Sequence, residues 1–80
     1  MVTKSYWFLR IGNDYLEEAL RYSTKRAAVE EFRRVALELD QYGQAIEGAL
    51  HCAPKREALE EYPDYMLLLG PRGGVRVEGC

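Results

Sequence analysis

The stretch STKRAAVEEFRRVALELDQYG, residues 23–43, decides the fold of this chain because it is the segment with a clear helical period. Its apolar positions fall within an arc of about 100° at 3.6 residues per turn. They are Ala28, Phe32, Val35, Ala36 and Leu39. Ser23 and Thr24 offer hydroxyl groups that can cap the first turn, and Gly43 is the kind of left-handed residue that ends helices. The sequence therefore predicts an amphipathic helix over residues 25–42 that buries one face.

Five further segments have the composition and alternation of β-strands. They are residues 4–11, 14–22, 44–53, 65–69 and 75–78. The first segment is dense in aromatic and β-branched residues and ends at the turn GND, and the last two flank the turn GPRGG. Residues 14–22 alternate as a second hairpin strand would, although their residue types also have high helix propensity. We predict a strand over residues 14–22, with a helix as the alternative.

The order of these segments predicts an α+β fold. A mainly antiparallel sheet of four to five strands should carry one long helix packed on one face. Eighty residues allow one hydrophobic core, so we expect a single domain over residues 1–80. Because one helix covers only one face of such a sheet, the second face must be solvated, buried in a homodimer or used to bind a partner.

Composition and charge narrow the class of protein. The chain is 48% hydrophobic and 30% charged, which is ordinary for a compact globular domain. Eleven basic and thirteen acidic side chains give a net charge of −2, whereas proteins that neutralise many phosphates are usually strongly basic. Direct binding to nucleic acid is therefore disfavoured. The sequence has no long apolar run and no signal-peptide pattern, so we expect no membrane association and a location in the cytoplasm.

Residues that usually carry catalysis or hold metals are sparse. His51 is the only histidine, and its neighbour Cys52 should point to the opposite face of a strand, so the two side chains cannot act together. One histidine and two distant cysteines give no zinc-ligand spacing. We interpret Cys52 as a small core residue and Cys80 as an incidental terminal thiol, in keeping with a reducing compartment. We expect no catalytic residue, no cofactor and no metal site, and hence no enzyme.

Aromatic side chains are the more informative class. In the first strand Trp7, Leu9 and Ile11 share one face, while Tyr6 and Phe8 share the other. If Trp7 lies under the helix, the second pair lies on the open face, where exposed aromatics anchor protein partners or stack on single-stranded nucleic acid. The structural alternative is that the charged connection over residues 55–63 covers both rings.

Several short motifs resemble those of a known group of proteins. They are STK at residues 23–25, LDQYGQ at 39–44, EYPDY at 61–65 and LGPRGGVR at 69–76. Together they span nearly the whole chain and resemble short accessory proteins carried by phages and mobile elements of Proteobacteria. Among these, the sequence is similar to anti-CRISPR proteins that act on a type I surveillance complex, with type I-C as the subtype it resembles. The motifs lie at caps and turns, so they indicate a shared fold more than a shared chemistry.

The resemblance implies a stoichiometric inhibitor that docks on the CRISPR surveillance complex and stops it from binding target DNA, without enzyme activity. The partner would be a subunit with a basic DNA-binding surface, for which an acidic patch can compete. The candidate partner-binding residues are Glu57, Glu60, Glu61, Tyr62 and Asp64 in the connection, Glu17 and Glu18 before the helix, and Tyr6 and Phe8 on the open face. Because the net charge is only −2, we expect a local acidic patch rather than a whole-molecule mimic of DNA.

Two other functions stay open at this point. One is a small nucleic-acid-binding module that uses Tyr6, Phe8 and nearby arginines on the open sheet face. The other is a self-associating regulatory domain that buries this face in a homodimer. Salt-dependent binding to single-stranded nucleic acid would identify the first, and light scattering would identify the second.

Overall fold

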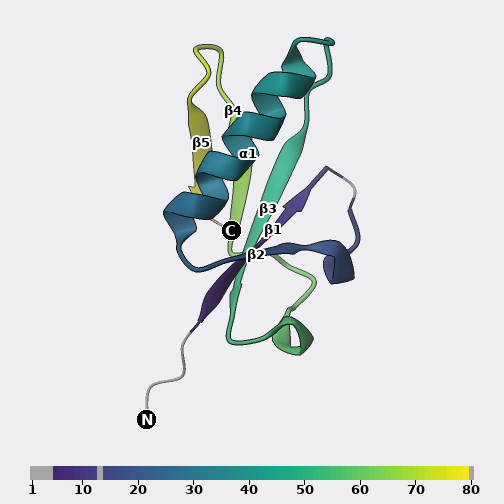
Figure 1. Ribbon diagram of the computed structural model, residues 1–80, viewed down its shortest axis with the longest axis vertical. Coiled ribbons are helices and arrows are strands. Elements are labelled where there is room, and N and C mark those ends of the chain that lie inside the picture. The colour runs from purple at the N-terminus through teal and green to yellow at the C-terminus, as the bar shows by residue number, and fades with distance from the viewer. Residues whose placement is uncertain (1–4, 13, 80) are drawn as a thin grey trace.

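The computed structural model describes residues 5–12 and 14–79 (Figure 1). They form, in chain order, β1 (Tyr6–Ile11), the 3-10 turn η1 (Leu16–Glu18), β2 (Leu20–Tyr22), α1 (Lys25–Asp40), β3 (Glu47–Ala53), the 3-10 turn η2 (Arg56–Ala58), β4 (Tyr65–Leu69) and β5 (Val75–Gly79). The strands make one antiparallel sheet in the order β2-β1-β3-β4-β5, and α1 crosses one face of it diagonally. The predicted α+β fold, a sheet with one long helix on one face, is confirmed.

The helix α1 forms where its apolar period and its caps agree. The Thr24 hydroxyl accepts a hydrogen bond from the Ala27 amide at 3.1 Å, which satisfies a free amide of the first turn. The helix ends at Asp40, and the chain then turns through Gly43, whose φ is 74°. No helix in the described part of the chain is long and apolar enough to span a bilayer.

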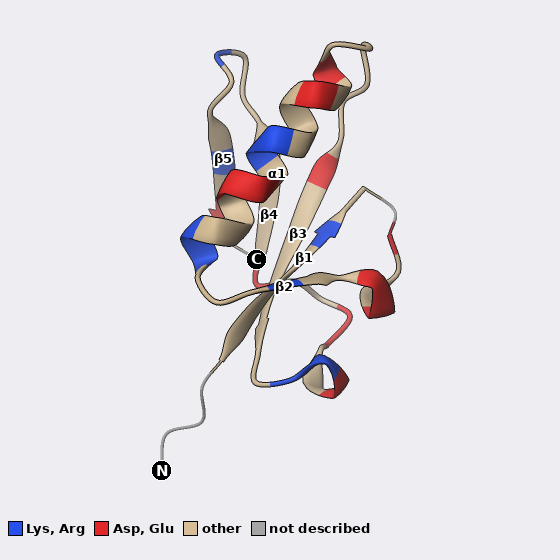
Figure 2. Cartoon of the chain, in the orientation of Figure 1, with Lys and Arg blue, Asp and Glu red and all other residues tan. Residues whose placement is uncertain are grey.

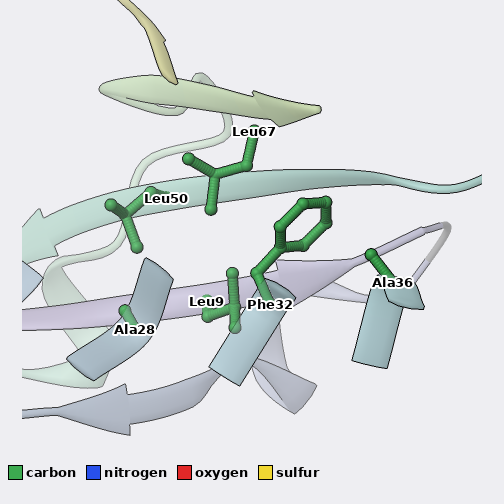
Figure 3. Close-up of a cluster of buried hydrophobic side chains, with 6 residues drawn as sticks. All are labelled: Leu9, Ala28, Phe32, Ala36, Leu50 and Leu67. Carbon is green, nitrogen blue, oxygen red and sulfur yellow. The ribbon is translucent and has the colours of Figure 1, made fainter. Parts of the chain in front are cut away.

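The main core lies between α1 and the sheet (Figure 3). The buried side chains in it are Leu9, Ala28, Phe32, Ala36, Leu50 and Leu67. Leu9 and Leu50 lie opposite each other on β1 and β3. The Phe32 ring packs directly on β3 at Gly48, where an added Cβ would lie 2.6 Å from the ring. Glycine at this position therefore allows the Phe32 ring to approach the sheet closely.

Residues 14–22 are not one strand, contrary to the prediction. Only Leu20–Tyr22 pairs with β1, and η1 precedes it, closed by the Glu18 amide donating to the Tyr15 carbonyl at 2.9 Å. A tertiary contact interrupts the strand: Ala19 is buried against Phe8 on the face of the sheet opposite α1. The chain must pass over that face before it joins β1, and this packing overrides the alternating pattern.

Cys52 is exposed, so its prediction as a core residue is wrong. It lies on the same side of β3 as Leu50 and pairs with Trp7 on β1. Leu50 is part of the main core, whereas Cys52 lies farther along β3, beyond the buried residues of that core and opposite the partly buried Trp7. The alternation of side chains along a strand therefore predicts on which side of the sheet a residue lies. It does not predict whether the helix covers that residue.

Candidate protein-interaction surface

Two connecting segments cover part of the sheet face opposite α1. They are residues 14–19, between β1 and β2, and residues 54–64, between β3 and β4. The Arg56 guanidinium joins them by donating to the Glu17 carbonyl at 2.8 Å. We call the outer side of these two segments the acidic loop surface, because most of their charged side chains are acidic.

Phe8 is the centre of a second, smaller core beneath this surface. It is 1% exposed, so its interpretation as an open anchor for a partner is wrong. Ala19 and Ala53 are buried against Phe8, and Tyr6 and Leu59 pack around them while partly exposed. The alternative interpretation, that a connection covers the ring, holds for Phe8. The cover includes Ala19 from the first segment as well as the connection after β3.

His51 and Arg10 hold the second segment against the sheet. His51 is 2% exposed, and its Nε2 accepts a hydrogen bond from Arg10 Nε at 3.0 Å. Burial, and then the positive charge of Arg10, lower the pKa of His51, while Asp64 and a hydrogen bond to the Glu60 backbone oppose this shift. A neutral imidazole bonded to a strand residue on one side and to a connection on the other acts as a structural pin.

Asp64 makes the second attachment of this segment. Its carboxylate accepts a hydrogen bond from the Cys52 amide at 2.7 Å, and its own amide donates to the Leu50 carbonyl at 2.8 Å. The carboxylate of Asp64 therefore serves the fold, which lowers its weight as a residue that contacts a partner. His51 pairs with Phe8 and Cys52 with Trp7, so the imidazole and the thiol lie on opposite sides of the sheet, as predicted.

Most charged residues of the two segments are acidic, as the colouring of the chain in Figure 2 shows. Residues 14–19 and 54–64 hold seven acidic and two basic side chains, a net charge of −5, while the rest of the chain holds six acidic and nine basic ones, a net charge of +3. The seven, all exposed, are Asp14, Glu17, Glu18, Glu57, Glu60, Glu61 and Asp64. Among the residues that the structure describes, none of the seven forms an ion pair. The overall charge of −2 thus conceals a strong separation of charge.

Two tyrosines project from the same segments. Tyr62 is 84% exposed and Tyr15 is 71% exposed. Tyr62 belongs to the predicted set, whereas Tyr15 and Asp14 do not, because a strand over residues 14–22 gives no reason to select them. One local signal argues against a strand there. Two adjacent glutamates follow the GND turn, and glutamate is a poor strand former. The structure thus brings the predicted residues of both segments to one side of the sheet and adds these two.

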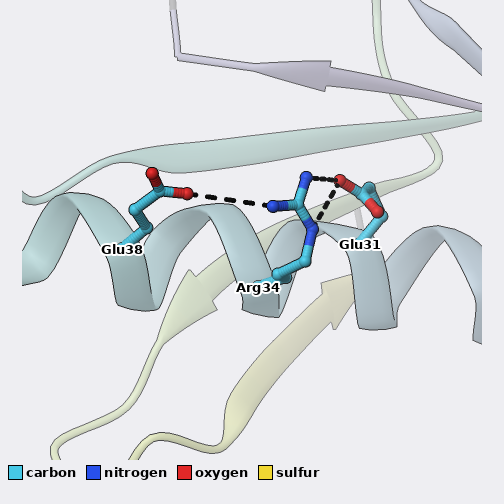
Figure 4. A network of polar contacts seen from close by, with 3 residues as sticks. All are labelled: Glu31, Arg34 and Glu38. Carbon is cyan, nitrogen blue, oxygen red and sulfur yellow. Dashed lines mark hydrogen bonds and ion pairs between the residues drawn. The ribbon is translucent and has the colours of Figure 1, made fainter.

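Charges on the outer face of α1 are arranged differently (Figure 4). Arg34 bonds Glu31 in the preceding turn, and its Nη1 lies 3.8 Å from the Glu38 carboxylate in the following turn. The helix carries four basic and four acidic residues in all. Neighbouring charges of opposite sign neutralise each other along the helix, so this face has no excess of either sign.

A groove of about 840 Å³ lies between the C-terminal end of α1 and the β4–β5 hairpin. Its walls include apolar Leu37, Ile46 and Leu69, together with Asp40 and Arg72. No group of three or more His, Cys, Asp or Glu side chains that could hold a metal ion occurs in residues 5–12 and 14–79. We place the candidate site on the acidic loop surface, because the charge separation is concentrated there.

Comparison of the chain with known protein families, curated proteins and solved structures finds no match. The anti-CRISPR resemblance therefore stays a prediction from the sequence motifs.

Proposed function

We propose that this protein is a stoichiometric binding protein that docks its acidic loop surface on a basic, nucleic-acid-binding surface of a protein partner. The observation that carries the proposal is the set of seven exposed acidic side chains on two adjoining segments with a net charge of −5. Like charges held close together repel each other and oppose folding. A basic partner relieves that repulsion, so the arrangement is better explained by binding than by stability.

The chemistry of such a partner follows from what it must recognise. Proteins that bind DNA or RNA line the site with Lys and Arg side chains, and carboxylates attract the same side chains as phosphates do. Opposite potentials speed the encounter and exclude partners of like charge. The exposed rings of Tyr15 and Tyr62 add apolar contact area of the kind found at the centres of interfaces. A protein seated in this way excludes the nucleic acid.

The acidic loop surface is fastened to the sheet at several points. Arg10 Nη2 donates to the Glu61 carbonyl at 3.4 Å, and the Cys52 amide donates to the Asp64 carboxylate at 2.7 Å, so β1 and β3 both hold the second segment. The Arg56 guanidinium links that segment to the first by donating to the Glu17 carbonyl. Segments held in place before binding lose less conformational freedom when a partner docks. This favours a surface that acts as a preformed unit.

The resemblance to anti-CRISPR proteins supplies the partner class, a type I RNA-guided surveillance complex, with type I-C first. In that setting the bound protein would block the site for target DNA. A nucleic-acid-binding module is less well supported, because Phe8 is buried and Arg10 is bonded to His51. The acidic loop surface would also repel a phosphate backbone.

The experiment combines two measurements on purified components at about 0.1 M salt. Size-exclusion chromatography with type I surveillance complexes should show co-elution at a fixed stoichiometry. Fluorescence anisotropy of labelled target DNA should show that the protein prevents DNA binding, less strongly as salt increases. Absence of co-elution with every type I complex tested would reject this partner class. Salt-dependent binding of the protein itself to single-stranded DNA or RNA would support the nucleic-acid-binding module instead.

A further inference from the structure

The last strand, β5, forms an edge of the sheet (Figure 1). It pairs with β4 on one side, and no described residue pairs with its other side. Residues 76–79 are exposed, and Val75 at the start of the strand packs against the main core. The opposite edge strand, β2, has only three residues. An edge of five residues with unpaired amides and carbonyls is a template for another strand.

The hydrogen-bond phase of β5 shows which backbone groups face outward. The hairpin closes with the Gly70 amide donating to the Gly74 carbonyl at 2.7 Å. Hydrogen-bonded and non-hydrogen-bonded pairs alternate along an antiparallel ladder, so Arg76 and Glu78 direct their backbone groups toward β4. The residues that direct theirs toward the open side are Val75, Val77 and Gly79.

We propose that β5 pairs with β5 of a second copy of this chain, antiparallel and with Val77 on the two-fold axis. This register makes Val77 and Val77 of the second copy a hydrogen-bonded pair, and it places Val75 opposite Gly79. Arg76 then lies opposite Glu78 of the second copy, and Glu78 opposite Arg76. Both flanking pairs join unlike charges at the closer, non-hydrogen-bonded positions.

The order of charges in β5 selects this register and a second copy as the occupant. An axis at Arg76 or Glu78 would place like charges directly opposite each other on the axis. A shift by one residue would turn the valines to the wrong side of the sheet. The Arg76 Nε atom lies 2.9 Å from Glu78 Oε1 within the strand, so both charged groups lie on one side and within reach of a neighbour. The strand is thus complementary to itself.

The pairing would join two five-stranded sheets edge to edge, with both helices on one face. The acidic loop surface lies on the other face, so each copy keeps its own surface free. Such a dimer offers two binding surfaces and gains from multivalent contact where a partner repeats its site. A contact of five residues a side is smaller than the roughly 800 Å² per partner of a standard interface, so we expect dimers to form at high protein concentration.

Sedimentation velocity of the full chain over a wide concentration range, with reductant present, tests the proposal. The wild-type protein should shift from monomer to dimer as its concentration rises, and a monomer throughout overturns the proposal. Val77→Pro removes an amide that faces outward and leaves the β4 ladder intact, as edge strands allow. This variant should stay monomeric with a thermal midpoint close to that of the wild type. Equal dimerisation of Val77→Pro overturns the proposal as well.

Charge reversal tests the register. Arg76→Glu and Glu78→Arg each place like charges opposite each other and should raise the dimer Kd by on the order of tenfold. The double variant Arg76→Glu with Glu78→Arg restores unlike pairs and should recover the wild-type Kd. Arg21→Glu, a single reversal on the other edge strand, is the matched control and should leave the Kd unchanged. A double variant that stays weak, or a control that weakens the dimer equally, shows that the copies meet elsewhere and rejects β5 pairing.

Discussion

The two faces of the sheet are covered in different ways. Under α1, apolar side chains at a helical period fill the main core, and Arg34 pairs with acidic residues on the outside of the helix. On the other face, two short connections cover the smaller core around Phe8 and carry acids that form no ion pair among the described residues. The difference is one of charge: opposite charges are paired on the helix-covered face, whereas the acids of the loop-covered face are left for the partner that we propose.

Truncation in the main core should have the largest effect. Phe32→Ala removes a fully buried ring that packs on Gly48, and we expect it to lower the free energy of unfolding by about 3 to 5 kcal/mol. The free energy of unfolding of a small domain is itself only a few kcal/mol, so a large fraction of the variant should be unfolded at about 37 °C. Urea denaturation followed by circular dichroism measures the loss. A loss below about 1 kcal/mol would show that α1 is not the main stabilising layer.

Phe8→Ala is the matched truncation on the other face. The cavity would lie beneath two short connections that can partly collapse, so we expect a loss near the lower end of about 3 to 5 kcal/mol, smaller than for Phe32→Ala. Amide hydrogen exchange should show the loss of protection concentrated in residues 14–19 and 54–64. Equal loss of protection across α1 and all five strands would show that the two cores act as one.

The cap of α1 should have an intermediate effect. Thr24→Ala removes the hydroxyl that accepts from the Ala27 amide, and we expect a loss of about 1 kcal/mol. Thr24→Ser keeps the acceptor and should retain nearly all the stability. If both variants behave alike in thermal denaturation, the hydroxyl does not cap the helix in solution.

Acid should loosen the loop-covered face before the helix-covered one. The pKa of His51 is lowered from 6.5 in the folded protein, so as pH falls below 6.5 the unfolded chain gains a proton before the folded chain does. The contribution of His51 is complete above that pH and is lost as pH falls toward the folded pKa. His51→Gln does not titrate, so its unfolding free energy should depend less on pH in this window. If the unfolding free energies of the two proteins depend on pH in the same way, the His51 imidazole does not hold the connection to the sheet.

Neutralising acids should have the smallest effect on stability. Glu57, Glu60 and Glu61 changed together to Gln relieve repulsion, and we expect a shift of no more than about 0.5 kcal/mol, toward greater stability. The control changes Glu30, Glu31 and Glu38 to Gln, which removes the partners of Arg34 and should cost a similar small amount. Thermal denaturation compares the two. A clear loss in the first variant would mean that the acids on the connection stabilise the fold.

The helix-covered face could be predicted well from the sequence because local signals and tertiary packing agree there. The apolar period of residues 25–42, the Thr24 cap and the turn at residues 70–74 all indicate structures that the chain adopts. The end of the helix at Asp40 differs from the prediction by two residues, a position that capping alone rarely fixes.

The loop-covered face could be predicted only in part. The acids at residues 57–61 and at Glu17 and Glu18 stand out in the sequence, but their placement on one side depends on Ala19 and Leu59 packing over Phe8. Those contacts join residues far apart in the chain and have no period. For the same reason the strand over residues 14–22 and the choice of Phe8 as a partner-binding residue were wrong. No local pattern identifies the bond between Arg10 and His51.

The role of the acidic loop surface is tested most directly by competition against target DNA. Increasing amounts of protein are added to a type I surveillance complex with labelled DNA, using the wild type, the Glu57/Glu60/Glu61 variant and the Glu30/Glu31/Glu38 control, which has the same change in charge. We expect the first variant to need at least about tenfold more protein to displace DNA, and the helix control to match the wild type. Equal displacement by all three proteins would show that the acidic loop surface is not where the partner binds.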